Sequence, residues 1–459
     1  MNRREGLRSV VVVGNGLVAL SAAIGFARAL PQAAVTLVAT APDPAALADR
    51  LPAVTPQVAE AFEALGLDED ALVAAGAATH RVGERFSWGD APFTIGEGDG
   101  VESLAGAALH QLWLAHGEGP FAALVPGAAL AAAERFVPPV GDPRSLLSRF
   151  DYTLRLDADR ATPVFVRAAH AAGVRVVRAD GLHVMRDGGG VAAVETDDGR
   201  LGADLFIDAS GPAALLAAGD AAWIDWRATL PVDRLVLGAA PPRPSPADRY
   251  TATAGGWTAQ WPLVGRTLTG IATTGAAPSA EGAAIALHPR RQVAPFAGNV
   301  IAMGDAAAAL GPLGWPGFAL ALAHLELALA LMPARTAEPL LIAEYNRRAT
   351  LRAERFHAYA AAFYRTDAPP PAELATARAQ FGQRGTLPPL EEAMVPESMW
   401  QQALIGLGIR PARHDPVALS VPRATATAAL AQLRDAVAAL PDGLPAYPDY
   451  LAHVMRGAR

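Results

Sequence analysis

The chain has 459 residues, 52% of them hydrophobic, and a formal net charge of −7, a length that predicts a discontinuous two-domain enzyme. No basic stripe occurs, so we do not expect nucleic acid as a partner. There is no cysteine, and all 38 basic residues are arginine, which excludes disulfides, thiolate nucleophiles, cysteine metal sites and any mechanism that uses a lysine amine.

Residues 9–38 predict a β-strand, a glycine turn, a helix over 17–30 and a second strand. The turn, Gly14-Asn15-Gly16-Leu17-Val18-Ala19, fits Gly-x-Gly-x-x-Gly/Ala. In this pattern Gly14 makes the tight turn, Gly16 lets a pyrophosphate approach the backbone, and Ala19 allows close packing of helix on strand. The unit therefore predicts a dinucleotide site, and the alternative is a glycine turn that binds no nucleotide.

Residues 9–27 carry no charge and follow three arginines, which imitates a signal-peptide core. The short β-branched run that ends at Gly14 favours strand, turn and helix instead. A second uncharged run, 306–323, is interrupted by glycine and proline and is not expected to span a membrane. We therefore predict a soluble, cytoplasmic protein with no membrane partner.

The end of the second strand lacks the acidic residue that usually binds the adenosine ribose. Val38-Ala39-Thr40 stands there, and Asp43 follows before Pro44. Either Thr40 or Asp43 takes this role, or the cofactor binds weakly. The same absence argues against a dedicated NAD site.

The middle of the chain predicts alternating elements. The last strand of this part, 205–207, ends in Asp208-Ala209-Ser210-Gly211, a small-residue corner that lies beside the cofactor in flavin folds or is an ordinary turn. The other expectations are a helical stretch over 43–80, a mixed insertion over 81–150, a helix over 157–172, and strands at 174–177, 182–186 and 190–196 with turns at Asp187-Gly188 and Asp198-Gly199.

The remainder predicts a substrate sheet over 220–295, helices over 318–332 and 338–364, a loop over 365–390, and short helices over 391–459. The fold class is therefore α/β. We expect a Rossmann-like FAD-binding domain of the aromatic-hydroxylase type (1–80, 150–215 and 296–335), a substrate-binding β-sheet domain (81–149 and 216–295) and a helical C-terminal region (336–459).

The stretch 299–317 predicts the rest of a flavin cradle. A buried-type strand runs into Gly304-Asp305, and Gly317 stands near the start of the next helix. Asp305 can accept hydrogen bonds from ribityl hydroxyls, and Gly317 presents backbone N–H groups to the flavin ring. The predicted cofactor-binding residues are Gly14, Gly16, Leu17, Val18, Ala19, Thr40, Val177, Gly304, Asp305, Pro312 and Gly317.

Over nearly its full length the sequence resembles the flavin-dependent tryptophan halogenase family. The resemblance is carried by Val11–Val38, Gly76–Phe86, Tyr152–Asp159, Ala203–Gly211, Glu344-Tyr345-Asn346 and Ser398–Pro411. It implies reduced FAD supplied in trans by a transiently bound flavin reductase, a flavin C4a-hydroperoxide formed with oxygen, and hypohalous acid that reaches a lysine beside the substrate.

The chain departs from this family at the reacting centre. The family's lysine falls at Arg81, whose guanidinium stays protonated and is a poor nucleophile. The family's catalytic glutamate falls at Gly314, and its Ser-Thr pair beside the halide becomes Trp315-Pro316. The halogenase signature Trp-x-Trp-x-Ile-Pro becomes Trp257-Thr-Ala-Gln-Trp261-Pro. These changes argue against halogenation by the known route.

Gly304-Asp305, Pro312, Gly314 and Gly317 also resemble the pattern of flavin monooxygenases that oxygenate aromatic rings directly. We therefore expect a monooxygenase acting on a small aromatic, indole-type substrate. The candidates for the substrate pocket are Trp257, Trp261 and Trp315; the alternative is that these tryptophans belong to the core. The candidates for catalysis are His80, Arg81 and Glu84; the alternative is that these side chains have structural partners. On a strand, His80 and Glu84 would lie on one face and Arg81 on the other.

Two other hypotheses remain open from the sequence. The chain is a flavin-binding protein that has lost catalysis, or a halogenase in which Arg81 guides the oxidant without a lysine. No metal site is expected. The oligomeric state is open, and a homodimer is one of the states the sequence allows.

Overall fold

The computed structural model describes residues 5–89, 91–188, 190–217, 222–275 and 284–457. The chain forms two compact units. Unit 1 comprises residues 1–72, 156–233 and 285–357, and unit 2 comprises residues 73–155, 234–284 and 358–459. Residues 336–357, which the sequence assigned to the C-terminal region, thus fall in unit 1.

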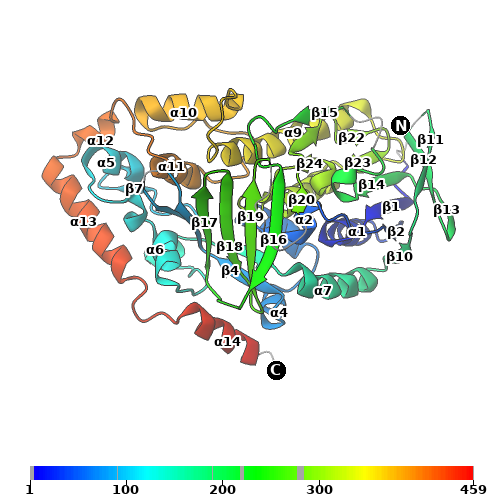
Figure 1. The fold of residues 1–459 in the computed structure, drawn as a ribbon, viewed down its shortest axis with the longest axis horizontal. Coiled ribbons are helices and arrows are strands. Elements are labelled where there is room, and N and C mark those ends of the chain that lie inside the picture. The colour runs from blue at the N-terminus through cyan, green and yellow to red at the C-terminus, as the bar shows by residue number, and fades with distance from the viewer. Residues whose placement is uncertain (1–4, 90, 189, 218–221, 276–283, 458–459) are drawn as a thin grey trace. The chain divides into compact units, whose positions relative to one another are not determined.

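Unit 1 is built on a six-stranded sheet of order β10-β2-β1-β14-β23-β22 (Figure 1), in which all neighbouring pairs are parallel except β23 and β22. Its strands are β1 (Ser9–Gly14), β2 (Ala34–Ala39), β10 (Arg175–Arg178), β14 (Leu205–Ala209), β22 (Phe296–Ala297) and β23 (Val300–Ala302). The βαβ unit predicted for 9–38 is confirmed. Helix α1 (Leu17–Ala29) contacts β1, β2 and β14 and packs on α7 (Ala158–Ala171) and α8 (Pro316–Ala330).

A second, antiparallel sheet covers the other face of the parallel sheet in unit 1. It consists of β11 (His183–Asp187), β12 (Gly190–Thr196) and β13 (Gly199–Leu201). Val11 and Val13 of β1 share one buried cluster with Val191 and Val194 of β12, because alternate side chains of a strand point to the same face. The parallel sheet is therefore buried on both sides, which fits its continuous Val-rich strands.

The remaining elements of unit 1 are short or flank the sheet. They are α2 (Leu47–Arg50), β3 (Ala53–Val54), η1 (Pro56–Val58), α3 (Ala59–Glu63), η4 (Gly211–Ala213), β15 (Trp223–Asp225), β21 (Arg290–Gln292), η5 (Gly304–Ala306) and β24 (Ala308–Ala309). The chain passes between the units at five points, and four of these lie inside further elements: α4 (Glu69–Ala74), β9 (Thr153–Leu156), β20 (Ala284–Ala286) and α9 (Pro339–Ala361).

Unit 2 contains most of a mainly antiparallel, seven-stranded sheet of order β20-β16-β19-β18-β17-β5-β6, of which β16 to β20 are labelled in Figure 1. Besides β20, its strands are β5 (Gly83–Ser87), β6 (Phe93–Gly96), β16 (Arg234–Ala240), β17 (Ala247–Thr253), β18 (Gly256–Pro262) and β19 (Thr267–Thr273). This agrees with the sheet predicted within 220–295; residues 220–221 and 276–283 of that prediction lie outside the described residues. A separate strand, β4 (Ala78–Arg81), lies beside β9.

The helices of unit 2 include one that the sequence did not predict. They are α5 (Leu109–His116), η2 (Phe121–Leu124), α6 (Pro126–Ala133), η3 (Leu146–Ser148), α10 (Ala372–Arg384), α11 (Glu397–Gly406), α12 (Pro416–Ser420), α13 (Arg423–Ala439) and α14 (Tyr447–Gly457), with the small strands β7 (Ser103–Leu104) and β8 (Ala107–Ala108). The loop predicted for 365–390 is wrong, because α10 occupies its middle. Three prolines (369–371) precede the helix, Gly385 ends it in a left-handed conformation, and Leu374, Ala377 and Phe381 form its buried face.

In the described part of the chain, no helix is long and apolar enough to cross a bilayer.

Candidate flavin cradle and the Arg81 network

The predicted cofactor residues of unit 1 lie at the carboxyl ends of three neighbouring parallel strands. β1 ends at the glycine turn, β14 ends at Ala209, and β23 runs into Gly304-Asp305. Ligands of open α/β sheets bind in the crevice at such strand ends. Gly14 has no room for a side chain, since a Cβ there would collide with the carbonyl of Ala209 on the adjacent strand and would lie 3.1 Å from the Ala19 Cβ.

A carboxylate of the chain itself lies at the glycine turn. The Asp49 Oδ1 accepts a hydrogen bond of 2.8 Å from the backbone N–H of Val18, in the first turn of α1, and the backbone N–H of Leu17 also lowers the pKa of this carboxyl group. A Cβ on Gly16 would collide with the Asp49 carboxyl group. Asp49 therefore occupies the place at the helix N-terminus where the fingerprint puts a pyrophosphate.

The neighbours of Asp49 in α2 contact the other predicted parts of the cradle. The Asp305 Oδ2 accepts a 2.7 Å hydrogen bond from Ala48 N–H. A Cβ on Gly317, in the first turn of α8, would lie 3.0 Å from the Ala48 Cα and Cβ. A Cβ on Gly211 would lie 2.9 Å from the Ala46 Cβ. Segments far apart in sequence thus converge on one short stretch of chain.

The other predicted cofactor residues have ordinary structural contacts. The Thr40 carbonyl accepts a 2.8 Å hydrogen bond from Asn15 Nδ2. The Asp43 Oδ1 accepts one from Ala45 N–H, and Val177 pairs with Val38 within the sheet. Gly304 packs on Val18, and Pro312 is buried. Thr40 stands where an acidic side chain would bind the adenosine ribose, and its hydroxyl carries no charge.

The shape of this cradle decides whether a flavin fits. Its backbone N–H groups, glycines and Asp305 are the donor and acceptor types that a flavin dinucleotide needs. The space beside Gly16 and Gly317 is, however, filled by Asp49 and Ala48. A flavin does not fit unless this stretch moves.

Burial makes the carboxyl groups of the cradle weaker acids than usual. It raises the pKa of Asp305 to about 8, against the lowering effect of the Ala48 N–H, and the nearby Asp49 and Asp43 raise it further. Burial likewise raises the pKa of Asp49 to about 7, although the residue as a whole keeps part of its surface exposed and two backbone N–H groups oppose the shift. Near neutral pH the two carboxyl groups therefore favour keeping at least one proton between them in total, because ionisation of one raises the pKa of the other.

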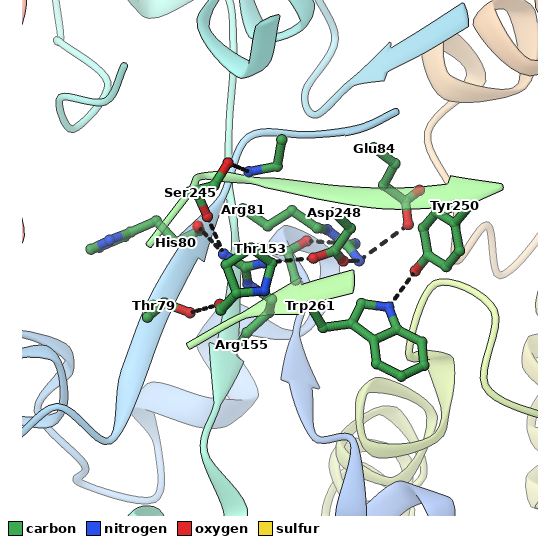
Figure 2. Close-up of polar contacts among 12 residues, drawn as sticks. Thr79, His80, Arg81, Glu84, Thr153, Arg155, Ser245, Asp248, Tyr250 and Trp261 are labelled. Atoms are coloured by element: carbon green, nitrogen blue, oxygen red, sulfur yellow. Dashed lines mark hydrogen bonds and ion pairs between the residues drawn. The ribbon is translucent and has the colours of Figure 1, made fainter. Parts of the chain in front are cut away.

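In unit 2, Arg81 lies inside a buried ion network (Figure 2). Its guanidinium contacts Glu97 at 2.8 Å, Asp248 at 3.2 Å and Glu84 at 3.3 Å. Thr153 Oγ1 accepts another of its N–H groups and donates to Glu97. Arg155 binds the other side of Asp248 and donates to the carbonyls of His80 and Ser245.

Two guanidinium groups in this network face three carboxyl groups. Burial would lower the pKa of Arg81, but Glu84, Glu97 and Asp248 outweigh it and raise that pKa well above its ordinary value. Burial raises the pKa of Glu84 to about 7 despite Arg81, and the other two carboxylates add to the rise. The network therefore favours a permanently charged Arg81 and a Glu84 that is protonated below neutral pH.

The expectation that His80 and Glu84 share one strand face is wrong. Val82 separates β4 from β5, and Glu84 lies on β5, where its side chain reaches Arg81. His80 is buried. Its backbone N–H donates to the Tyr447 hydroxyl at 2.6 Å, and its ring stacks on Phe136 with centroids 4.2 Å apart.

The three predicted pocket tryptophans are almost completely buried. Trp261 donates its indole N–H to the Tyr250 hydroxyl and Trp257 donates to that of Tyr364, each at 3.1 Å. Both rings pack edge to face on Tyr250 in unit 2. Trp315, in unit 1, precedes α8 with a left-handed φ of 59°. The residue before a proline avoids the right-handed helical region. Pro316 therefore makes the right-handed helical conformation unfavourable for Trp315.

The sequence pointed to the glycine turn, Asp305 and Arg81, but not to the residues that bind them in the cradle and in the Arg81 network. It did not single out Ala48, Asp49, Glu97, Arg155 or Asp248. A lone charge in an apolar strand, as in Thr153-Leu-Arg155-Leu, was a usable signal, because such a charge is buried only with a partner. No comparable local signal marks Asp49. Within the described residues no group of three or more His, Cys, Asp or Glu could hold a metal ion.

Comparisons with known proteins identify the family. The chain is similar to the structure of BrvH, a flavin-dependent halogenase from Brevundimonas sp. BAL3, with 27% identity, a TM-score of 0.88 and coverage of 98% of this chain and 99% of that one. It is similar in fold to Xcc4156, a flavin-dependent halogenase from Xanthomonas campestris, with 24% identity, a TM-score of 0.88 and the same coverage. The tryptophan 6-halogenase SttH from Streptomyces toxytricini gives 23% identity, a TM-score of 0.84 and coverage of 98% and 100%.

No curated protein sequence matches the chain. The family model described as tryptophan halogenase matches residues 9–423, which is most of the sequence. The α/β fold, with a Rossmann-like unit and a β-sheet unit, agrees with this match. The chain therefore belongs to the tryptophan halogenase family of enzymes.

Proposed function

We propose that this protein is an FAD-dependent oxidoreductase that acts on an aromatic, indole-type substrate as a monooxygenase, without a lysine. The observation that carries the flavin assignment is the convergence of the glycine turn, the Gly211 corner, Asp305 and the N-terminus of α8 on one place in unit 1. A flavin would supply the redox chemistry. We expect it to arrive reduced, from a transiently bound flavin reductase.

The Arg81 network supports a reaction other than lysine-dependent halogenation. Arg81 is held by three carboxyl groups and one hydroxyl, so its N–H groups are engaged and its charge is fixed. In this arrangement neither Arg81 nor Glu84 is free to exchange protons with a substrate without breaking buried ion pairs. We therefore assign both to the structure of unit 2 rather than to the reaction.

A second candidate function is flavin binding without catalysis. The filled cradle and the burial of His80, Arg81 and Glu84 favour it. Both candidates bind the flavin, but only the first forms a product.

The test supplies chemically reduced FAD and oxygen to the purified protein with a panel of indoles and phenols. Product masses are measured in chloride, in bromide and without halide. A product that gains one oxygen atom independently of halide supports the monooxygenase. Halide-dependent products would replace it with a halogenase that needs no lysine, and flavin binding with no product from any aromatic would select the non-catalytic candidate.

A further inference from the structure

The turn that follows β15 and the adjoining face of α9, both in unit 1, bring a hydroxyl, an imidazole and a carboxylate into line. Thr229 Oγ1 lies 2.8 Å from His357 Nε2, and His357 Nδ1 lies 3.1 Å from Glu354 Oε2. We propose that Thr229 is an activated nucleophile that takes an acyl group from small activated esters, with His357 as its base and Glu354 as the residue that positions the base. This site shares no residue with the flavin cradle and does not depend on the proposed flavin function.

The carboxylate decides which ring nitrogen of the histidine can accept a proton. Glu354 also accepts a hydrogen bond of 2.7 Å from Arg291 Nε, on β21. Burial raises the pKa of Glu354, but the hydrogen bonds from His357 and Arg291 outweigh it and hold that pKa below its ordinary value. Because an ionised carboxylate can only accept a hydrogen bond, we assign the proton of the neutral ring to Nδ1. Nε2 then presents its lone pair to the Thr229 hydroxyl, as a general base must.

Packing holds the base and the nucleophile in this arrangement. The Trp226 ring stacks on the imidazole of His357, with centroids 4.2 Å apart and an angle of 17° between the rings. His357 and Glu354 are three residues apart in α9 and therefore lie on one face of the helix. The Trp226 carbonyl accepts the backbone N–H of Thr229 at 3.0 Å, which closes the turn that carries the hydroxyl.

The hydroxyl lies between a buried base and the surface of unit 1. His357 is buried, Thr229 is half-buried, and the two residues before Thr229, Arg227 and Ala228, are exposed. The Trp226 carbonyl is a second acceptor for the hydroxyl, at 3.1 Å. The imidazole is nearer than this carbonyl, and only the imidazole is basic enough to remove the proton.

The reaction transfers an acyl group to the threonine oxygen. Thr229 Oγ1 attacks the carbonyl carbon of the ester and forms a C–O bond, while its proton passes to His357 Nε2. The bond from that carbon to the leaving oxygen then breaks, and the leaving alcohol or phenol takes the proton from His357. The Thr229 N–H is bonded to the Trp226 carbonyl, so it does not stabilise an oxyanion. We therefore expect acylation only by esters with good leaving groups.

The test incubates the purified full-length protein with p-nitrophenyl acetate. Nitrophenolate absorbance gives the rate, and mass spectrometry of the intact chain and its peptides locates the acetyl group. The chain has no lysine, which removes the usual competing acceptors. We expect a burst of nitrophenolate and an acetyl group on Thr229. Thr229→Ser should still be acetylated at this position, whereas Thr229→Val should lose the burst.

Three further variants separate activation from structure. His357→Gln should slow acetylation of Thr229 at least about tenfold, and Glu354→Gln should give an intermediate rate. Thr162→Val is the matched control and should react like wild type, because Thr162 is also half-buried but its hydroxyl donates to the Ala158 carbonyl. Thermal unfolding shows that each variant is folded. A wild-type protein without an acetyl group on Thr229, or equal rates in wild type and His357→Gln, would overturn the proposal.

Discussion

The cradle of unit 1 and the Arg81 network of unit 2 are both positions where the family resemblance predicts chemistry, yet their polar groups are satisfied in different ways. In the cradle, a short segment supplies Asp49 and Ala48 to backbone N–H groups and to Asp305. In the network, side chains from β4, β5, β9 and β17 bind one another, and all of them are buried.

This difference indicates which of the two sites, the cradle or the Arg81 network, can still accept a ligand. Backbone N–H groups at a helix end are fixed by the fold and can exchange one partner for another. A buried guanidinium that loses a carboxylate leaves an uncompensated charge, which is costly. We therefore expect the cradle to respond to ligands and the network to respond only to unfolding.

The largest effect should come from breaking the network. Arg81→Ala removes the cation that pairs with Glu84 and Glu97 and leaves Asp248 with Arg155 alone, and we expect the free energy of unfolding to fall by about 3–5 kcal/mol. Denaturant unfolding of the purified protein measures it. The control is Arg85→Ala, at a half-buried arginine of β5, where we expect a loss below about 1 kcal/mol. Equal stability of wild type and Arg81→Ala would contradict a structural role.

Restoring the family's residue should give a smaller loss and no new reaction. In Arg81→Lys the charge remains, but one ammonium cannot reproduce the bonds that the guanidinium makes to Glu97, Asp248 and Thr153. We expect a stability loss of about 1–3 kcal/mol, measured by denaturant unfolding, and no halogenated product by mass spectrometry in bromide. A brominated product from this variant would show that the network is open to an oxidant.

The network has one more carboxyl group than guanidinium groups, and the pH dependence of its stability tests the role of Glu84. The pKa of Glu84 is raised to about 7 in the folded protein, so its contribution to stability is fully present below its unfolded pKa and is lost as pH rises through about 7. Glu84→Gln imitates the protonated form. We expect it to match wild type within about 1 kcal/mol near pH 4 and to become relatively more stable with rising pH. A stability difference that does not change with pH would contradict the raised pKa.

The smallest and most local effect should appear in the cradle. Asp49 and Asp305 have raised pKa values of about 7 and about 8, and the groups that face them are Asp43 and the N–H groups of Leu17, Val18 and Ala48. Because both pKa values are raised, ionisation of the two carboxyl groups disfavours the position of α2 against α1, so protection of the Val18 amide should fall as pH rises from about 4 to 8, by up to about tenfold per pH unit for each carboxyl.

Hydrogen exchange, corrected for its intrinsic pH dependence, measures this fall, and Asp49→Asn should flatten it. Protection that rises with pH would reverse the sign and contradict the pKa shift of Asp49.

The sequence by itself determined the frame of this protein. Local signals that repeat within a few residues, such as the Val10–Val13 run, the Gly14–Ala19 turn and the strand before Gly304-Asp305, are enough to place a Rossmann-like unit. The absence of lysine and cysteine was equally visible. These features depend on neighbours along the chain, so no tertiary contact was needed to read them.

Only the tertiary structure decided what fills the sites. Val18 and Asp49 are 31 residues apart, and Ala48 and Asp305 are 257 apart. Arg81 meets Asp248 across 167 residues. Such pairs arise because the fold brings buried polar groups together and each must find a partner away from water. A glycine fingerprint can therefore predict that an anion belongs at Gly16, but it cannot tell whether the cofactor or the chain's own Asp49 provides it.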